Sequence, residues 1–171
     1  MHRAVFIQAN GILFNPSGDP TPTPSLFEDI VINIPAKSEI EKLAKAKFLL
    51  IALIQEKGIA NGSMSKSVSN ALINLLKQSF PLTHVYCCYH SNVPEEQKCS
   101  CMQSDGFVIE AKANWRIELS ASFLASTRID DTRMARAAGC KAIAFGSVSR
   151  DPCHDIFAPT VEKMVKTILS Y

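Results

Sequence analysis

The sequence has 171 residues, of which 47% are hydrophobic and 20% charged, and its formal net charge is +2. This length is enough for one domain with a substantial core, and the composition is typical of folded globular proteins. The small net charge argues against nucleic acid or an anionic membrane surface as a partner. The longest apolar run, residues 48–54, is too short to span a bilayer.

Short apolar runs alternate along the chain with segments of helical periodicity. The candidate strands are residues 4–7, 48–54, 85–88, 121–125 and 142–145. The candidate helices are residues 38–46, 65–80, 105–113, 130–138 and 159–169. Residues 15–25 contain three prolines at alternate positions and are predicted to form an extended surface loop.

Individual residues predict where some of these helices begin and end. Ser38 and Glu41 have the spacing of a capping box at the start of the first helix. Gly139 follows the helix at residues 130–138, as expected of a glycine just beyond a helix end. Pro159 stands near the first turn of the last helix, a position that proline tolerates.

The alternation of strands and helices predicts a single α/β domain that covers residues 1–171. Its sheet should be doubly wound, mostly parallel and covered on both faces. Functional residues in such sheets follow the carboxyl ends of the strands. The positions of interest therefore come directly after Ile7, Leu53, Cys87 and Ala125.

Four possible metal ligands, Cys88, His90, Cys99 and Cys101, lie within one short segment, residues 88–101. Three thiolates and one imidazole complete a tetrahedral zinc site and leave no position open for water, so the zinc would be structural. Disulfides are the alternative explanation. Because Cys87 adjoins Cys88, it is an alternative ligand, although its place in an apolar run favours a buried strand residue.

The expected cellular compartment favours a metal site over disulfide bonds for these cysteines. Residues 1–7 lack the apolar core and the cleavage site of a signal peptide, so we expect a cytoplasmic protein. The cytoplasm is reducing, and clustered cysteines there usually bind metal.

Several segments resemble motifs of one enzyme superfamily: residues 3–12, residues 55–62, the cysteine-rich residues 88–101, residues 126–131 and residues 137–140. Together they resemble the haloacid dehalogenase superfamily, in particular its small phosphatases for heptose 1,7-bisphosphate and histidinol phosphate. The resemblance covers nearly the whole chain and implies a Rossmann-like domain with a zinc loop.

The resemblance also implies two catalytic aspartates, and this chain has amides at both positions. Gln8 stands where the family has its nucleophile, and Asn10 where it has its general acid and base. An amide is not anionic, is a poor nucleophile and does not exchange a proton usefully near neutral pH. Ile54 replaces a hydroxyl that would contact phosphate.

The groups that would bind phosphate and Mg²⁺ are changed as well. Gln103 lies in a segment that replaces the family's Arg-Lys-Pro, and Thr127 replaces an Mg²⁺-binding aspartate, whereas the next aspartate is retained as Asp131. Mg²⁺ needs carboxylate oxygens, so it is not expected here. The cleft is predicted to persist, lined by Gln8, Asn10, Gln55, Gln103 and Asp131.

These residues favour a zinc-stabilised phosphatase homologue that has lost catalysis and acts as a binding or regulatory protein. The expected partner is another protein or a weakly bound polar small molecule. One alternative is an active sugar-phosphate or histidinol-phosphate phosphatase with relocated catalytic groups. Another is a thiol- or metal-handling protein that uses its six cysteines.

Overall fold

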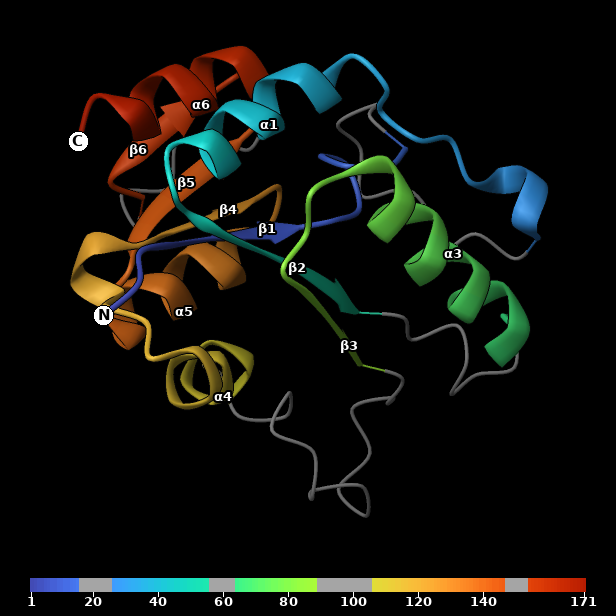
Figure 1. Cartoon of the computed structure of the whole chain (residues 1–171), viewed down its shortest axis with the longest axis horizontal. Coiled ribbons are helices and arrows are strands. Elements are labelled where there is room, and N and C mark those ends of the chain that lie inside the picture. Colours follow the sequence, from blue (N-terminus) through green and yellow to red (C-terminus); the bar gives the residue numbers. More distant parts are fainter. Residues whose placement is uncertain (16–25, 56–63, 89–105, 147–153) are drawn as a thin grey trace.

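The computed structural model describes residues 1–15, 26–55, 64–88, 106–146 and 154–171. At its centre is a six-stranded sheet in the order β3-β2-β1-β4-β5-β6, in which all neighbouring strands are parallel (Figure 1). The strands are β1 (Ala4–Gln8), β2 (Leu49–Gln55), β3 (His84–Cys88), β4 (Phe123–Ser126), β5 (Lys141–Phe145) and β6 (Ile156–Ala158). The predicted parallel sheet is confirmed.

The described part of the chain contains five α-helices, which cover both faces of the sheet. They are α1 (Ala36–Lys45), α3 (Lys66–Ser79), α4 (Gly106–Trp115), α5 (Ile129–Ala138) and α6 (Val161–Leu169). In Figure 1, α1, α3 and α6 lie on one side of the sheet, and α4 and α5 lie on the other. The fold is therefore a three-layer, doubly wound α/β domain, as the sequence predicted.

The central strand β1 is buried along its whole length. Val5 and Ile7 belong to the core cluster that includes side chains of α1, α3 and α6. Ala4 and Phe6 belong to a second cluster with side chains of α4 and α5. Successive side chains of a strand point to opposite faces, so a strand covered on both faces is apolar throughout. Gln8 is the one polar residue of β1 and stands at its carboxyl end.

One predicted helix signal, Gly139, is confirmed, another, Ser38, is wrong, and the cap at Ser65 was not predicted. The Ser65 side chain caps α3 by accepting a hydrogen bond from the Val68 N–H, and Gly139 ends α5 with a φ of 89°. Ser38, however, lies inside α1 and is not its cap. The helical turn begins earlier because the carbonyl of Asn33 already accepts a hydrogen bond from the Ala36 N–H.

The edge strand β6 was not predicted. It has three residues and pairs in parallel with β5, and its central residue, Phe157, is 47% exposed. A run this short carries too little periodicity to be recognised in the sequence. The last helix, α6, begins after Thr160, whose side chain accepts a hydrogen bond from the Lys163 N–H, so Pro159 precedes the helix.

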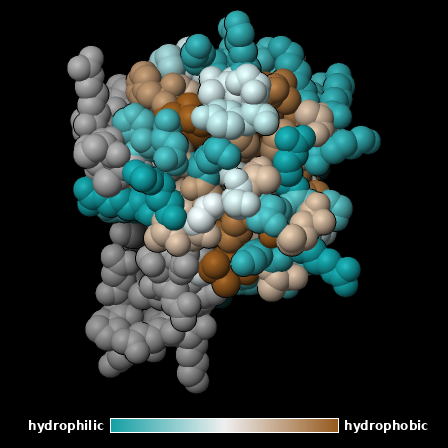
Figure 2. Space-filling view, turned by 90° about the vertical axis from the view of Figure 1, so that its left-hand side faces the viewer, coloured by the Kyte–Doolittle hydropathy of each residue, from teal (hydrophilic) through white to brown (hydrophobic). Residues whose placement is uncertain are grey.

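The surface of the domain is mainly hydrophilic on the side shown in Figure 2. There, apolar side chains are scattered among polar ones outside the grey segments. No helix in the described part of the chain is long and apolar enough to cross a membrane.

Candidate functional site

The strand order creates a switch point between β1 and β4. From β1 the chain continues towards β2 and β3 on one side, and from β4 towards β5 and β6 on the other. The connections therefore diverge, and the crevice between them at the carboxyl ends of the strands is where ligands of doubly wound sheets bind. Gln8 ends β1 and Ser126 ends β4, so both stand at this crevice.

A tight turn follows β1. The Ala9 carbonyl accepts a hydrogen bond from the Leu13 N–H at 2.8 Å, and the Gly11 N–H donates to the Phe14 carbonyl at 2.8 Å. Gly11 has a φ of +85°, a region that side chains with a Cβ rarely adopt. A Cβ at Gly11 would also lie 3.0 Å from Thr127 Cγ2. The turn after β1 therefore rests directly against the loop after β4.

Two neutral amides stand at this crevice. Gln8 is buried, with 5% of its surface exposed, and Asn10 is half-buried with its side-chain oxygen enclosed. An amide supplies one acceptor oxygen and two N–H donors, but no negative charge. The pair suits hydrogen bonding to a polar group better than nucleophilic attack or metal binding.

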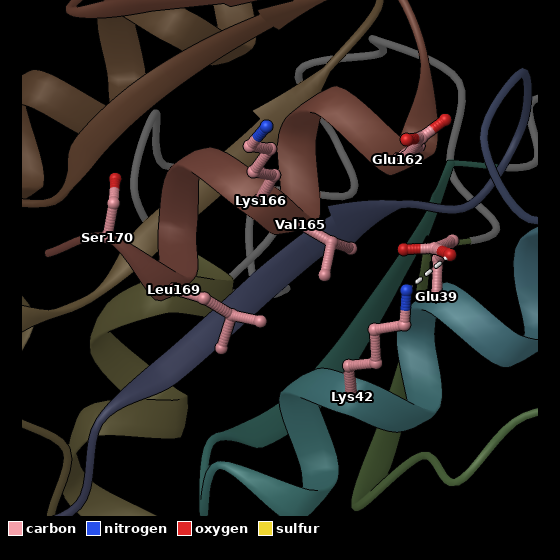
Figure 3. A pocket seen from close by; sticks show the side chains of 7 residues that line it. All are labelled: Glu39, Lys42, Glu162, Val165, Lys166, Leu169 and Ser170. Carbon is pink, nitrogen blue, oxygen red and sulfur yellow. Dashed lines mark hydrogen bonds and ion pairs between the residues drawn. The ribbon is translucent and has the colours of Figure 1, made fainter.

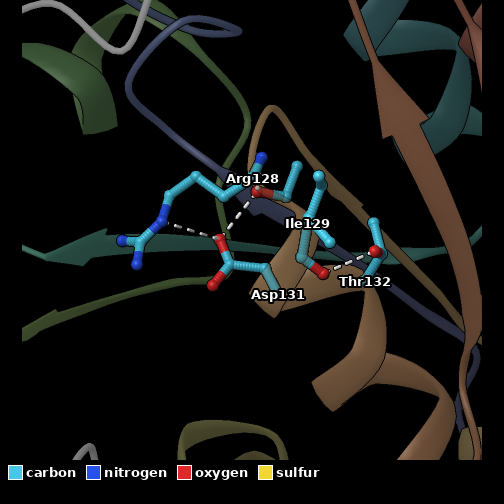
Figure 4. A network of polar contacts seen from close by, with 5 residues as sticks. Arg128, Ile129, Asp131 and Thr132 are labelled. Carbon is cyan, nitrogen blue, oxygen red and sulfur yellow. Dashed lines mark hydrogen bonds and ion pairs between the residues drawn. The ribbon is translucent and has the colours of Figure 1, made fainter. Parts of the chain in front are cut away.

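The surviving carboxylate, Asp131, is engaged by its own loop (Figure 4). Ser126 Oγ donates a hydrogen bond to Asp131 Oδ2 at 2.6 Å, and the Arg128 N–H donates to Ser126 Oγ at 3.0 Å. The guanidinium of Arg128 approaches the same Asp131 oxygen, with Nε at 4.0 Å. One turn further, Thr132 Oγ1 donates to the Ile129 carbonyl at 2.6 Å. These contacts fix the loop between β4 and α5.

Burial dominates the electrostatics of Asp131. Burial raises the pKa of its carboxyl, and the neighbouring Asp130 adds a smaller rise, whereas Arg128 and the hydrogen bond from Ser126 lower it. Desolvation penalises the charged form of any carboxyl, and a nearby cation or donor offsets part of that penalty. Asp131 is the third residue of α5, where the positive end of the helix dipole also favours a negative charge.

The sequence reasoning missed Ser126 and Arg128 as members of this site. Their roles depend on the three-dimensional path of the loop, because Ser126 ends a strand and Asp131 lies in the following helix. The signal in the sequence was that both residues flank Thr127 within the motif segment at residues 126–131.

The remaining predicted cleft residues are only partly described. Ile54 is 1% exposed and belongs to the core cluster on the α1, α3 and α6 side, so its side chain is a packing residue. Gln55 ends β2 beside β1, but its side chain lies outside the described residues, as does Gln103. The structure therefore brings Gln8, Asn10 and Thr127 to one edge of the sheet.

Only one of the four predicted zinc ligands lies among the described residues. Cys88 ends β3 and is buried, whereas His90, Cys99 and Cys101 lie outside the described part. No three possible ligands gather elsewhere within the described residues. The zinc site thus stays a prediction.

The two neighbouring thiols of β3 face different layers. Cys88 belongs to the core cluster on the α4 side, whereas Cys87 packs against the cluster on the α3 side, with its Sγ 3.8 Å from Ser69 Oγ. A third thiol, Cys140, is buried, and burial raises its pKa to about 12. Such a thiol is not a nucleophile at neutral pH.

A separate groove of about 300 Å³ lies between α1 and α6 (Figure 3). Val165 and Leu169 are apolar, and the other lining residues are polar or charged: Glu39, Lys42, Glu162, Lys166 and Ser170. Lys42 Nζ pairs with Glu39 Oε1 at 2.6 Å. The groove lies in the helical layer, away from the crevice between β1 and β4, and mixed charges of this kind are typical of a solvated helix surface.

Comparisons with known proteins identify the fold. No protein-family model matches the sequence, and no curated protein sequence matches it significantly. Solved structures do match, and they show that the domain has the fold of haloacid dehalogenase-superfamily phosphatases.

Three of these structures show the extent of the similarity. D,D-heptose 1,7-bisphosphate phosphatase from B. bronchiseptica, complexed with magnesium and phosphate, matches with a TM-score of 0.74 and 15% identity over 99% of both chains. A putative phosphatase from Mesorhizobium loti matches with a TM-score of 0.73 and 19% identity, over 99% of this chain and 85% of the other. Deoxy-D-mannose-octulosonate 8-phosphate phosphatase from Haemophilus influenzae, in a cobalt-bound form, matches with a TM-score of 0.67 and 11% identity over 99% and 88%. At these identities the similarity concerns the fold alone.

Proposed function

We propose that this protein is a phosphatase-like domain that has lost catalysis and acts as a binding or regulatory protein. The observation that carries the proposal is the buried amide of Gln8 at the carboxyl end of β1. Phosphoryl transfer to a carboxylate nucleophile needs an anion at the reacting position, and an amide does not supply one.

Asn10 and Thr127 extend the same argument. Neither side chain exchanges a proton near neutral pH, so neither serves as general acid or base. Thr127 also packs against Gly11, which places a methyl group between the two loops. The two loops therefore contribute amide and hydroxyl groups to the crevice, where the resemblance implies carboxylates.

Mg²⁺ is a poor match for the described residues. Magnesium is held by carboxylate oxygens in octahedral geometry and loses its water reluctantly. The carboxylate of Asp131 already accepts a hydrogen bond from Ser126 and lies beside the cation of Arg128. A second cation at this carboxylate would be repelled by the guanidinium. We derive no reaction step through Mg²⁺ for this chain.

We also propose a structural zinc ion held by Cys88, His90, Cys99 and Cys101. The support comes from the donor set, which fills a tetrahedral zinc site, and from Cys88, whose side chain faces the α4 layer. Its role would be to fix the segment between β3 and α4. Zn–S distances of ~2.3 Å and a Zn–N distance of ~2.0–2.1 Å are expected.

The proposal is tested by hydrolysis of an aryl phosphate in the presence of Mg²⁺. We expect the full chain to give no turnover above the rate without protein. The matched variant is the triple substitution Gln8→Asp, Asn10→Asp and Thr127→Asp, which restores three carboxylates. Mg²⁺ should raise the melting temperature of this variant but not that of the unmodified chain, because only the variant binds the ion.

The alternative of an active phosphatase with relocated groups makes the opposite prediction. Robust turnover by the unmodified chain, abolished by Gln8→Ala or by Asp131→Asn, would establish it. Turnover that persists in both variants would come either from other groups of this chain or from a contaminating enzyme. Activity that follows the protein through a further purification step would assign it to this chain.

A further inference from the structure

We propose that residues 26–34 form a docking surface for an amphipathic helix of a partner protein, with apolar side chains flanked by Lys or Arg. Four large hydrophobic residues of this segment are exposed: Leu26 by 58%, Phe27 by 51%, Val31 by 57% and Ile34 by 63%. Among the described residues, nine large hydrophobic side chains are exposed, and four of them fall within these nine positions. On the face shown in Figure 2, by contrast, apolar side chains are scattered.

Residues 30–33 of this segment are held by the core and by hydrogen bonds to Asn15 and Ile12. Ile30 and Ile32 stand on either side of the exposed Val31 and pack against the core. The Asn15 N–H donates to the Val31 carbonyl at 2.7 Å, and the Val31 N–H donates to Asn15 Oδ1 at 3.0 Å. The side chain of Asn33 donates to the Ile12 carbonyl at 2.9 Å. A rigid backbone that holds apolar side chains in solvent is typical of a binding surface.

The charge of the segment indicates the chemistry of the partner. Glu28 and Asp29 are exposed in the 3₁₀ turn Phe27–Asp29, and residues 26–34 contain no cationic side chain, although the whole chain has a net charge of +2. An apolar helix face flanked by cations would cover the hydrophobic side chains and meet the two carboxylates. A second copy of this chain is a poorer match, because a two-fold contact would bring Glu28 and Asp29 close to their own equivalents.

The probe is a fluorescently labelled amphipathic helical peptide with leucines on one face and lysines on the other. Its matched control is the same peptide with glutamates in place of the lysines. With the full chain, we expect saturable binding of the lysine peptide that is at least tenfold tighter than binding of the glutamate peptide. Amide chemical-shift changes should concentrate at residues 26–34.

Variants assign the binding to this surface. The double substitution Phe27→Ser and Val31→Thr should weaken binding of the lysine peptide at least tenfold, and Glu28→Lys should reduce its preference over the glutamate peptide. Phe157→Ser is the matched control, because Phe157 is similarly exposed, at 47%, but lies on β6. It should leave the affinity unchanged. Near-ultraviolet circular dichroism checks that each variant is folded.

Three results would overturn the inference. Equal affinity for both peptides would remove the charge argument. A dimer in sedimentation experiments that Phe27→Ser dissociates would assign the surface to a second copy of the chain. Binding that requires excision of residues 16–25 would assign it to the chain's own segment.

This inference rests on the proposed binding role, but its failure can be recognised separately. Peptide binding is measured without phosphate or Mg²⁺. An active phosphatase would contradict the proposed function and leave the peptide result standing. An absence of peptide binding would contradict only the docking surface.

Discussion

Gly11 and Gly139 have nearly the same backbone conformation but different surroundings. Their φ angles are +85° and +89°. A Cβ added at Gly139 would have no neighbour within 4 Å, whereas at Gly11 it would lie 3.0 Å from Thr127 Cγ2. Gly139→Ala should therefore cost about 1–2 kcal/mol of unfolding free energy, the cost of the left-handed conformation alone. Gly11→Ala should cost more.

The additional loss of unfolding free energy expected for Gly11→Ala can be separated from the cost of the left-handed conformation by a second substitution. Thr127→Ser removes the methyl group that the new Cβ would meet. Denaturant unfolding should show that Gly11→Ala costs less in the Thr127→Ser background than in the unmodified chain. Equal costs in both backgrounds would mean that the two loops do not touch as described.

Asp131 makes stability depend on pH. Its pKa is raised in the folded state, mainly by burial, so folding favours the protonated carboxyl. Its contribution to the unfolding free energy is therefore full below the pKa of the unfolded state and is lost as the pH rises through the folded-state pKa. The advantage of the unmodified chain over Asp131→Asn should shrink from acid towards neutral pH. Denaturant unfolding of both proteins from acid to neutral pH measures this difference in unfolding free energy. A difference that grows with pH would show that the cation of Arg128 dominates the pKa of Asp131 instead.

At the scale of the elements, two serines near helix starts should behave differently. Ser65 caps α3 through the Val68 N–H, so Ser65→Ala should lower the unfolding free energy by about 1 kcal/mol. Ser38 lies inside α1 and caps nothing, so Ser38→Ala should be neutral or slightly stabilising, because alanine favours helix interiors. Thermal unfolding of the two variants provides the comparison. A destabilising Ser38→Ala with a neutral Ser65→Ala would reverse the assignment of the caps.

The strands and helices differ in how far the sequence predicts them. Strands β1 and β2 are recognisable because burial on both faces makes them continuous apolar runs. The start of α1 was misplaced because the backbone carbonyl of Asn33 begins the turn, and every residue type has such a carbonyl. Strand β6 is too short to show a period.

The sequence suggests site residues where a local motif exists and gives no sign of contacts that join separate elements. Gln8 is the last residue of β1 and Asn10 follows it closely, and β1 ends at the crevice, as the sequence predicted. The hydrogen bond between Ser126 and Asp131 joins a strand to the next helix, and no spacing rule predicts it.

At the scale of the whole molecule, the proposed zinc ion should contribute to stability. Site formation is coupled to folding of the segment that supplies the ligands. Cys99→Ala should therefore abolish stoichiometric zinc and lower the melting temperature, and a strong chelator should do the same to the unmodified chain. Elemental analysis together with thermal unfolding checks both effects. Retention of one zinc per chain in Cys99→Ala would contradict the proposed ligand set.

The doubly wound sheet still brings β1 and β4 together at its switch point, although the groups there are mostly neutral. The central claim is that this edge of the sheet no longer supports metal-dependent phosphoryl transfer. The most direct test is a calorimetric titration of the full chain with Mg²⁺, compared with the triple variant Gln8→Asp, Asn10→Asp and Thr127→Asp. We expect no saturable binding at sub-millimolar Mg²⁺ in the unmodified chain and measurable binding in the variant. Saturable sub-millimolar binding by the unmodified chain, lost in Asp131→Asn, would contradict the account.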